Sequence, residues 1–403
     1  MNCKRILAAL TAVSLTAAAV SVSADMRING DLNNDNRVKV ADLCMMKGIL
    51  TGADADKDIY DITQDGSVNT SDFVMLMQYI IGTVESLPAI QPQTPPYVQP
   101  TDQPIVTPTE QPTTTPVSDP SSYMQKVRAN IITPEPADIS QEKPGVDYGK
   151  VESITYMSTT AGREKRANVI LPAGYSTDKK YPVMFVNHGI FGNQDSMLDP
   201  SMGIQTISAN LAAEGEAEQM IIVLADMFSS KDMIFPSGYD IPTVEGYDAF
   251  VKDICDDLIP YIEANYSVKT GRENRAITGF SMGGRESLYI GISRPDVFGY
   301  IGGACAAPGI TPMVDGNMTH PGSMQEIEFK IKDSDPKPYI LMLTGAQFDG
   351  VVSNSPQKYD ELLTKNGTDH IWQEVPNGDH GGVTVRAHFY NFCKAAFRAD
   401  VND

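Results

Sequence analysis

The carboxyl-terminal part of the chain alternates short apolar runs with segments whose apolar residues recur at helical spacing. The apolar runs have the length of buried strands and cover residues 181–186, 220–225, 275–280, 339–344 and 371–375. Helix-like segments follow four of them, at residues 244–266, 282–293, 356–366 and 383–397. Strands that alternate with helices form a mostly parallel sheet with helices on its faces, and active residues lie at the carboxyl ends of the strands. The pattern predicts one large α/β domain over residues 121–403.

The first 24 residues have a different pattern. Lys4 and Arg5 precede an apolar run that ends at Val20, and Val22, Ser23 and Ala24 form a small-x-small cleavage site. The run is shorter than the roughly 20 residues that span a bilayer, and no other segment is long and apolar enough. Residues 1–24 are therefore predicted to be a signal peptide, so that the mature protein is secreted and has no membrane partner.

Residues 87–120 divide the mature chain. Proline recurs throughout this stretch among threonine and glutamine, and the stretch contains no lysine or arginine. Too few apolar side chains are present to form a core, and the prolines favour an extended conformation. At about 3.1 Å per residue the segment could extend on the order of 100 Å. We interpret it as a linker between a small unit at residues 25–86 and the large domain.

The small unit contains a duplication, because residues 31–42 align with residues 61–72 at an offset of 30. Oxygen-bearing side chains stand at loop positions 1, 3, 5 and 12 of both copies, which is how a loop wraps around calcium. An apolar helical stripe follows each loop, so we expect a small all-α module with two calcium ions. The predicted ligands are Asp31, Asn33, Asp35, Arg37 and Asp42 in the first loop and Asp61, Thr63, Asp65, Ser67, Asn69 and Asp72 in the second.

These two loops resemble the type I dockerin, over residues 28–83. The resemblance implies calcium-dependent docking onto a cohesin domain of a scaffoldin, and hence a place in a cellulosome. It departs at Lys39, which cannot ligate a cation at the ninth loop position. The residues that would face cohesin also differ between the copies, being Val40 and Ala41 in the first and Thr70 and Ser71 in the second.

The strongest chemical signal lies where the apolar run at 275–280 meets the next helix. Gly279, Ser281 and Gly283 form the pattern G-x-S-x-G, in which a serine sits on a strained strand-to-helix turn. A Cβ at either glycine would collide with the neighbouring elements as the chain reverses. Such a serine is a candidate nucleophile, and the N–H of Met282 is a candidate donor to an oxyanion.

A serine nucleophile needs a base. His380 lies in a glycine-rich loop after the run at 371–375 and before the last helix, where the base of an α/β-hydrolase belongs. His188 begins a loop better interpreted as the oxyanion loop, with Ile190 as the second N–H donor and Phe191 as its rival. The remaining histidines lie at less suitable places: His320, His370 and His388.

The base needs a carboxylate that holds its tautomer. Asp349 follows the run at 339–344 and lies between the serine and the histidine in the chain, which is the order found on this fold. The other aspartates of this interval are less suitable by position: Asp360, Asp369 and Asp379.

The large domain resembles the feruloyl and acetyl-xylan esterases of carbohydrate esterase family one, which are related to esterase D. The resemblance rests on residues 171–176, 187–190, 247–253, 258–266, 279–284 and 377–380. It implies an α/β-hydrolase fold, with Ser281 as nucleophile, His380 as base, Asp349 as orienting acid and no cofactor in the active site. The loops after His188 and around Asp349 differ from the usual pattern, so the acyl group, feruloyl or acetyl, stays open.

Charge narrows the range of partners. The chain has 31 Lys and Arg against 51 Asp and Glu, a formal net charge of −20, which argues against nucleic acid and anionic membranes as partners.

Together the sequence observations favour a secreted, cellulosomal serine carbohydrate esterase that cleaves feruloyl or acetyl esters from xylan side chains. The alternatives are a general short-chain acyl esterase or lipase and a non-catalytic, scaffold-docked carbohydrate-binding module.

Overall fold

The computed structural model of the protein describes residues 119–314 and 319–399, together with Leu32, Val38, Ile62 and Leu76. The predicted signal peptide, most of the linker and all of the predicted calcium ligands lie outside the described residues. Leu32 and Ile62, which occupy the same place in the two copies of the duplication, are both fully buried. No helix within the described ranges is long and apolar enough to cross a membrane.

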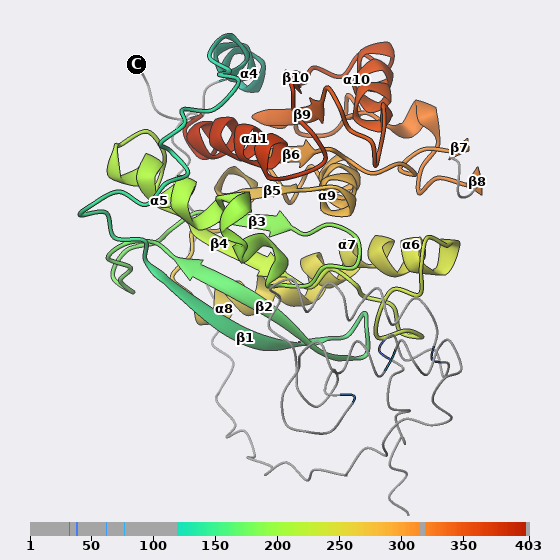
Figure 1. Ribbon diagram of the computed structural model, residues 1–403, viewed down its shortest axis with the longest axis horizontal. Helices are drawn as coiled ribbons and strands as arrows, with labels where there is room; N and C mark the ends of the chain where they lie inside the picture. The colour runs from blue at the N-terminus through green and yellow to red at the C-terminus, as the bar shows by residue number, and fades with distance from the viewer. Residues whose placement is uncertain are drawn as a thin grey trace, which may run out of the picture.

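An eight-stranded sheet forms the centre of the large domain, in the order β1-β2-β4-β3-β5-β6-β9-β10 (Figure 1). The six strands from β4 to β10 are parallel, and β1 and β2 pair antiparallel at one edge. This confirms the predicted α/β-hydrolase architecture. The strands are β1 (Lys150–Ser158), β2 (Arg163–Leu171), β3 (Val183–Asn187), β4 (Ile221–Ala225), β5 (Arg275–Gly279), β6 (Tyr300–Ala304), β9 (Ile340–Ala346) and β10 (Ile371–Val375), and a separate two-stranded pair consists of β7 (Met313–Val314) and β8 (Thr319–His320).

Helices cover both faces of the sheet. Helices α5 and α11 contact each other on one face, and α7 and α9 contact each other on the opposite face. Burial from both sides explains why every residue of β3 and β4 is buried and why these strands are apolar throughout, apart from Asn187 at the end of β3. The helices are α4 (Pro120–Ala129), α5 (Ile204–Ala213), α6 (Ile241–Asp248), α7 (Phe250–Asp253), α8 (Ile259–Asn265), α9 (Met282–Ser293), α10 (Ser355–Lys365) and α11 (Gly382–Ala395), with a π-helical turn at Ile254–Leu258 and 3₁₀ turns at Ser196–Leu198, Pro200–Met202, Arg272–Asn274 and Glu326–Glu328.

The predicted elements are present within a few residues of their expected ends. The five apolar runs correspond to β3, β4, β5, β9 and β10, and the helix expected at 244–266 consists of α6, α7, the π-helical turn and α8 in succession. The structure adds β1, β2, β6, β7, β8, α4 and α5, which were not predicted. Helix α4 begins at Pro120 with its N-terminus capped by the side chain of Asp119, at the last residues assigned to the linker.

Candidate active site

Ser281 stands between the end of β5 and the first residue of α9. Its φ of 58° lies in the left-handed region, which a non-glycine residue rarely adopts and which marks a strained turn. The strain persists because the glycines on either side permit close contacts. A Cβ on Gly279 would lie 2.5 Å from the carbonyl oxygen of Gly283, and one on Gly283 would lie 2.3 Å from the carbonyl oxygen of Asn187. The turn leaves the Ser281 hydroxyl free of any capping bond to α9.

Ser281, His380 and Asp349 form a continuous hydrogen-bonded chain. The Nε2 atom of His380 lies 3.0 Å from Ser281 Oγ, and its Nδ1 atom lies 2.8 Å from Asp349 Oδ2. The ring of Phe280 packs against the imidazole, with ring centroids 4.7 Å apart. The three side chains come from loops after β5, β9 and β10, so the carboxyl ends of parallel strands bring together residues that are 31 and 99 positions apart in the chain.

The carboxylate of Asp349 is buried and fully engaged, with a side-chain exposure of 1%. Burial by itself would raise its pKa. The hydrogen bond from His380 and those from the backbone N–H groups of Val352 and Val351 outweigh burial and hold the pKa below its ordinary value. Both backbone bonds reach Oδ1 at 2.9 Å, which leaves Oδ2 for the imidazole. The carboxylate is therefore ionised and fixed in orientation.

The other histidines and aspartates considered from the sequence have separate partners. Asp360 accepts a hydrogen bond from His370, and Asp369 pairs with Arg128. His388 is buried between the hydroxyls of Thr278 and Thr344. His320 is a buried residue of β8. Asp379 is adjacent to His380 in the chain, but the carboxylate that contacts the imidazole belongs to Asp349.

Two backbone N–H groups stand beside the serine without a hydrogen-bond partner among the described residues. One belongs to Met282, the first residue of α9, where helical N–H groups lack intrahelical acceptors. The other belongs to Ile190, whose neighbour Gly189 lies so close that an added Cβ would be 3.5 Å from Ser281 Cβ. The N–H of Phe191, the rival candidate, donates to the hydroxyl of Tyr247 at 3.0 Å. This geometry favours Met282 and Ile190 as the oxyanion donors.

The loop that carries Ile190 is held by a buried histidine. His188 Nε2 accepts a hydrogen bond from the N–H of Met227 at 3.1 Å, so the proton of the neutral ring is on Nδ1. Nδ1 then donates to the carbonyl oxygen of Gly189 at 2.7 Å. Because the carbonyl and the N–H of one peptide group point in opposite directions, this bond fixes the direction of the Ile190 N–H. His188 thus supports the loop that carries Ile190, and its hydrogen bonds within the described residues do not involve Ser281.

Two residues near the site were missed by the sequence analysis. Tyr247, fully buried in α6, holds the Phe191 backbone across 56 residues, a contact with no local sequence signal. Cys305 follows β6, and its thiol lies within 4.8 Å of the ligand atoms of Asp349 and His380. Burial raises the pKa of this thiol, so it is protonated. The trio could offer one sulfur, one oxygen and one nitrogen to a metal, but two of its members already bond to each other.

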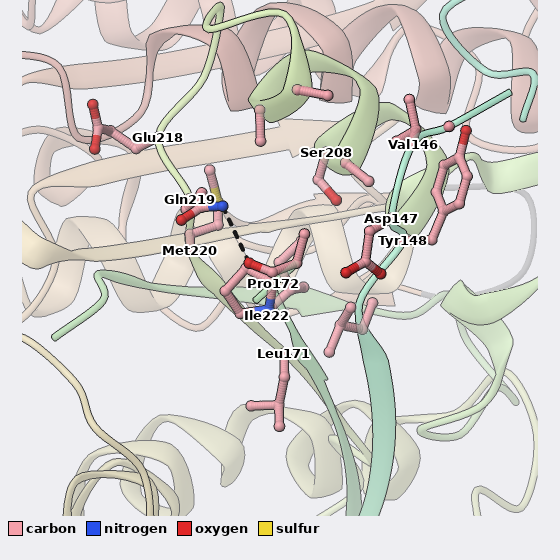
Figure 2. Close-up of a pocket in the computed structure, with 16 residues that line it drawn as sticks. Val146, Asp147, Tyr148, Leu171, Pro172, Ser208, Glu218, Gln219, Met220 and Ile222 are labelled. Atoms are coloured by element: carbon pink, nitrogen blue, oxygen red, sulfur yellow. Dashed lines mark hydrogen bonds between the residues drawn. The ribbon is translucent and has the colours of Figure 1, made fainter. Parts of the chain in front are cut away.

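A cavity of about 130 Å³ lies at the opposite end of the sheet. Figure 2 shows it between the end of β2 at Leu171, the start of β4 at Ile222 and helix α5 at Ser208. In the same view, Gln219 Nε2 donates to the carbonyl oxygen of Ala173 at 3.2 Å. The cavity lies at the amino end of β4. Because β3, β4 and β5 run parallel, this end is opposite to their carboxyl ends, where Ser281 follows β5. The cavity is not part of the candidate active site.

A mostly parallel sheet with a serine elbow, a histidine and a buried aspartate at its carboxyl edge defines the α/β-hydrolase class. Residues 158–374 match the putative esterase family. The match covers more than half of the chain, and the chain belongs to this family. Residues 29–81 match the type I dockerin domain, which confirms the predicted small module.

Solved structures and curated proteins give a consistent comparison. A CE1 ferulic acid esterase from the anaerobic fungus Anaeromyces mucronatus is 41% identical, with 66% of this chain and 96% of that chain covered and a TM-score of 0.62. An endo-1,4-beta-xylanase/feruloyl esterase of Xylanibacter ruminicola is 34% identical over 171 residues, and endo-1,4-beta-xylanase Y of Acetivibrio thermocellus is 27% identical over 179 residues. Each alignment covers 41% of this chain, but only 23% and 15% of the respective relative. The chain thus matches less than a quarter of the length of these two proteins.

Proposed function

We propose that the protein is a serine esterase that hydrolyses feruloyl or acetyl esters on xylan side chains through an acyl-enzyme. The observation that carries this proposal is the continuous hydrogen-bonded chain from Ser281 through His380 to Asp349. Beside it lie the N–H groups of Met282 and Ile190, which have no hydrogen-bond partner in the part of the chain that the structure describes. The alignment covers 96% of the ferulic acid esterase from Anaeromyces mucronatus, and this similarity supports feruloyl esters as a substrate class. A module that only binds carbohydrate would have no use for these hydrogen bonds, so they disfavour the non-catalytic alternative.

The geometry assigns a step to each residue. Ser281 Oγ attacks the ester carbonyl while His380 Nε2 takes its proton, and the N–H groups of Met282 and Ile190 stabilise the oxyanion. The carboxylate of Asp349 accepts the hydrogen bond from the Nδ1–H group of His380 and stabilises the imidazolium. His380 then gives the proton to the leaving alcohol, and a water molecule, activated by the same imidazole, releases the acid and restores the serine hydroxyl. The reaction needs no cofactor in this site.

We further propose a division of labour along the chain, with a signal peptide at 1–24, a dockerin at 25–86, a linker at 87–120 and the esterase domain at 121–403. The side-chain donors of the two loops are carboxylate, amide and hydroxyl oxygens, which suit calcium because it takes oxygen ligands. Arg37, at the seventh loop position, would contribute its backbone carbonyl oxygen. Calcium would order the loops when bound, and the dockerin would then hold a cohesin domain. The signal peptide and the dockerin together support an extracellular, scaffold-borne location.

A panel of substrates tests the activity. The purified full chain is assayed on methyl ferulate, acetylated xylan and p-nitrophenyl esters of increasing chain length, with Ser281→Ala as the matched control. Turnover of methyl ferulate or acetylated xylan that Ser281→Ala abolishes supports the proposal. A preference for p-nitrophenyl esters of unbranched acyl chains would favour the general esterase instead. Absence of turnover on every ester would favour the non-catalytic module.

A further inference from the structure

Large apolar side chains are exposed at the edge of the sheet that holds the candidate site. Several of those in the described residues lie in loops that follow the parallel strands, where solvent exposure of such side chains is unfavourable. Five of them come from the loops after β3, β4 and β9, and the sixth lies in the first turn of α11, after β10: Phe191, Ile234, Tyr239, Phe348, Val351 and Val383. An apolar rim at the active edge of the sheet indicates a substrate with an apolar part.

Two of these residues form an aromatic pair. The rings of Phe191 and Tyr239 meet edge to face, with centroids 5.2 Å apart and an interplanar angle of 80°. Their exposed fractions are 44% and 60%, so each ring keeps a free surface besides the one that it gives to its partner. Aromatic pairs of this geometry are usually buried, where their large area contributes most.

The backbone at both residues is fixed although the rings are exposed. Phe191 has a φ of 61°, in the left-handed region, and its N–H is held by the buried hydroxyl of Tyr247. Strained residues that the surroundings hold in place concentrate at ligand sites.

The segment around Tyr239 is fixed by the N-terminal cap of α6. Ser237 Oγ donates to Asp240 Oδ2 at 2.8 Å, and Asp240 Oδ1 accepts from the N–H of Thr243 at 2.9 Å. Tyr239 lies between these two anchors in the chain. The pair is therefore preorganised, which lowers the entropy that a ligand loses on binding.

The backbone of Phe191 lies near the reacting atoms. Gly189 packs against Ser281, and Phe191 follows it by two residues, a span of roughly 7 Å at most. Ile190, which offers the oxyanion N–H, stands between them. An acyl group longer than acetyl, with its carbonyl oxygen at the Ile190 N–H, is therefore within reach of the Phe191 side chain. A hydroxycinnamoyl group carries a planar ring two carbons beyond its carbonyl.

We propose that Phe191 and Tyr239 form the subsite for the aromatic ring of a hydroxycinnamoyl ester. This inference rests on the proposed function and selects the aromatic acyl group over acetyl. The free faces of the two rings stack against the phenolic ring of the substrate, and the strained backbone at Phe191 aims its side chain at that place.

The test compares an aromatic with a small acyl group. Phe191→Asn removes the ring but suits a left-handed backbone, since asparagine tolerates this region better than other residues. It is combined with Tyr239→Ala in a double variant, and Met157→Ala, with 59% exposure on β1, is the matched control for loss of an exposed apolar side chain. For each protein kcat/KM is measured on methyl ferulate, on p-nitrophenyl acetate and on feruloylated xylan oligosaccharides.

We expect the ratio of kcat/KM on methyl ferulate to kcat/KM on p-nitrophenyl acetate to fall by roughly 10-fold to 100-fold in the double variant, as for the loss of two aromatic contacts. Met157→Ala should leave the ratio as in the wild type. An unchanged ratio in a folded double variant overturns the subsite. So does a loss confined to feruloylated xylan oligosaccharides, because it would place the sugar on the rings. If the wild type hydrolyses no ester at all, the proposed function fails first.

Discussion

Replacing Asp349 by asparagine is the sharpest test of the catalytic assignment, because it changes one proton position and little else. The asparagine carbonyl can keep the two bonds to the N–H groups of Val351 and Val352, so the loop retains its shape. The amide group then faces His380 Nδ1 as a donor. The imidazole must accept there, which places its proton on Nε2, towards Ser281. In this tautomer His380 cannot take the serine proton.

The size of the effect follows from the lost tautomer. In serine proteases the same change lowers kcat by roughly 10⁴, equivalent to about 5 kcal/mol of transition-state stabilisation. We expect a loss of this size on a small soluble ester. Steady-state kinetics on p-nitrophenyl acetate measure it, and circular dichroism with thermal melting shows whether the variant has kept its fold.

Asp379→Asn is the matched control, since this aspartate is adjacent to His380 in the chain but does not contact the imidazole. It should reduce turnover far less than Asp349→Asn. The reasoning would be refuted by a folded Asp349→Asn variant with turnover within tenfold of the wild type. A larger loss in Asp379→Asn would transfer the role of orienting acid to Asp379.

The remaining predictions concern the nucleophile, acid stability and calcium. Ser281→Ala should lower kcat by about 10⁶ while the protein stays folded, and turnover near that of the wild type would exclude the site. Burial lowers the pKa of His388 from 6.5 to about 3, so between these pH values the unfolded chain binds a proton that the folded chain does not. The free energy of unfolding should therefore fall with decreasing pH in this window, by up to about 1.4 kcal/mol per pH unit from this group. Urea unfolding from pH 7 to 4 should show a smaller dependence of this free energy on pH in His388→Gln than in the wild type. An equal dependence in the two proteins would contradict the prediction. Chelation with EDTA should abolish cohesin binding, which added calcium restores, while hydrolysis of methyl ferulate stays unchanged; loss of that hydrolysis would show that the two parts are not independent.

The sequence predicts the centre of the sheet better than its edge. Strands β3 and β4 are buried on both faces and are therefore plain apolar runs. In contrast, β2 begins with charged residues, because the start of this strand is partly exposed near the edge of the sheet. Strand β6 has glycines where layers approach closely: a Cβ on Gly302 would lie 2.9 Å from His388 Nε2. The position of β2 near the edge and the close packing of β6 arise from tertiary structure, so neither strand shows a periodic pattern of apolar residues in the sequence.

The same distinction applies to the active site. Ser281 and His380 stand in local motifs, and chain order selects Asp349, so all three could be proposed from sequence and are adjacent in the structure. The choice of Ile190 over Phe191 depends on Tyr247, whose hydroxyl occupies the Phe191 N–H. That contact forms only when α6 packs beside the loop after β3. The aromatic pair of Phe191 and Tyr239 likewise joins two loops that no single sequence window contains.

Helix α4 determines how mechanical load enters the esterase domain. The chain from the preceding residues reaches the domain at Asp119, and Tyr123 in the first turns of α4 donates to the carbonyl oxygen of Ala395, the last residue of α11. Helix α11 begins two residues after His380 and is about 20 Å long. Helix α4 is attached to the far end of α11 and therefore lies well away from the catalytic loops. If the proposed dockerin held the protein to a scaffold while the substrate polymer held the esterase domain, tension would reach α4 and the far end of α11 first. Peeling of α4 would then relieve the force before it distorts the geometry of Ser281 and His380.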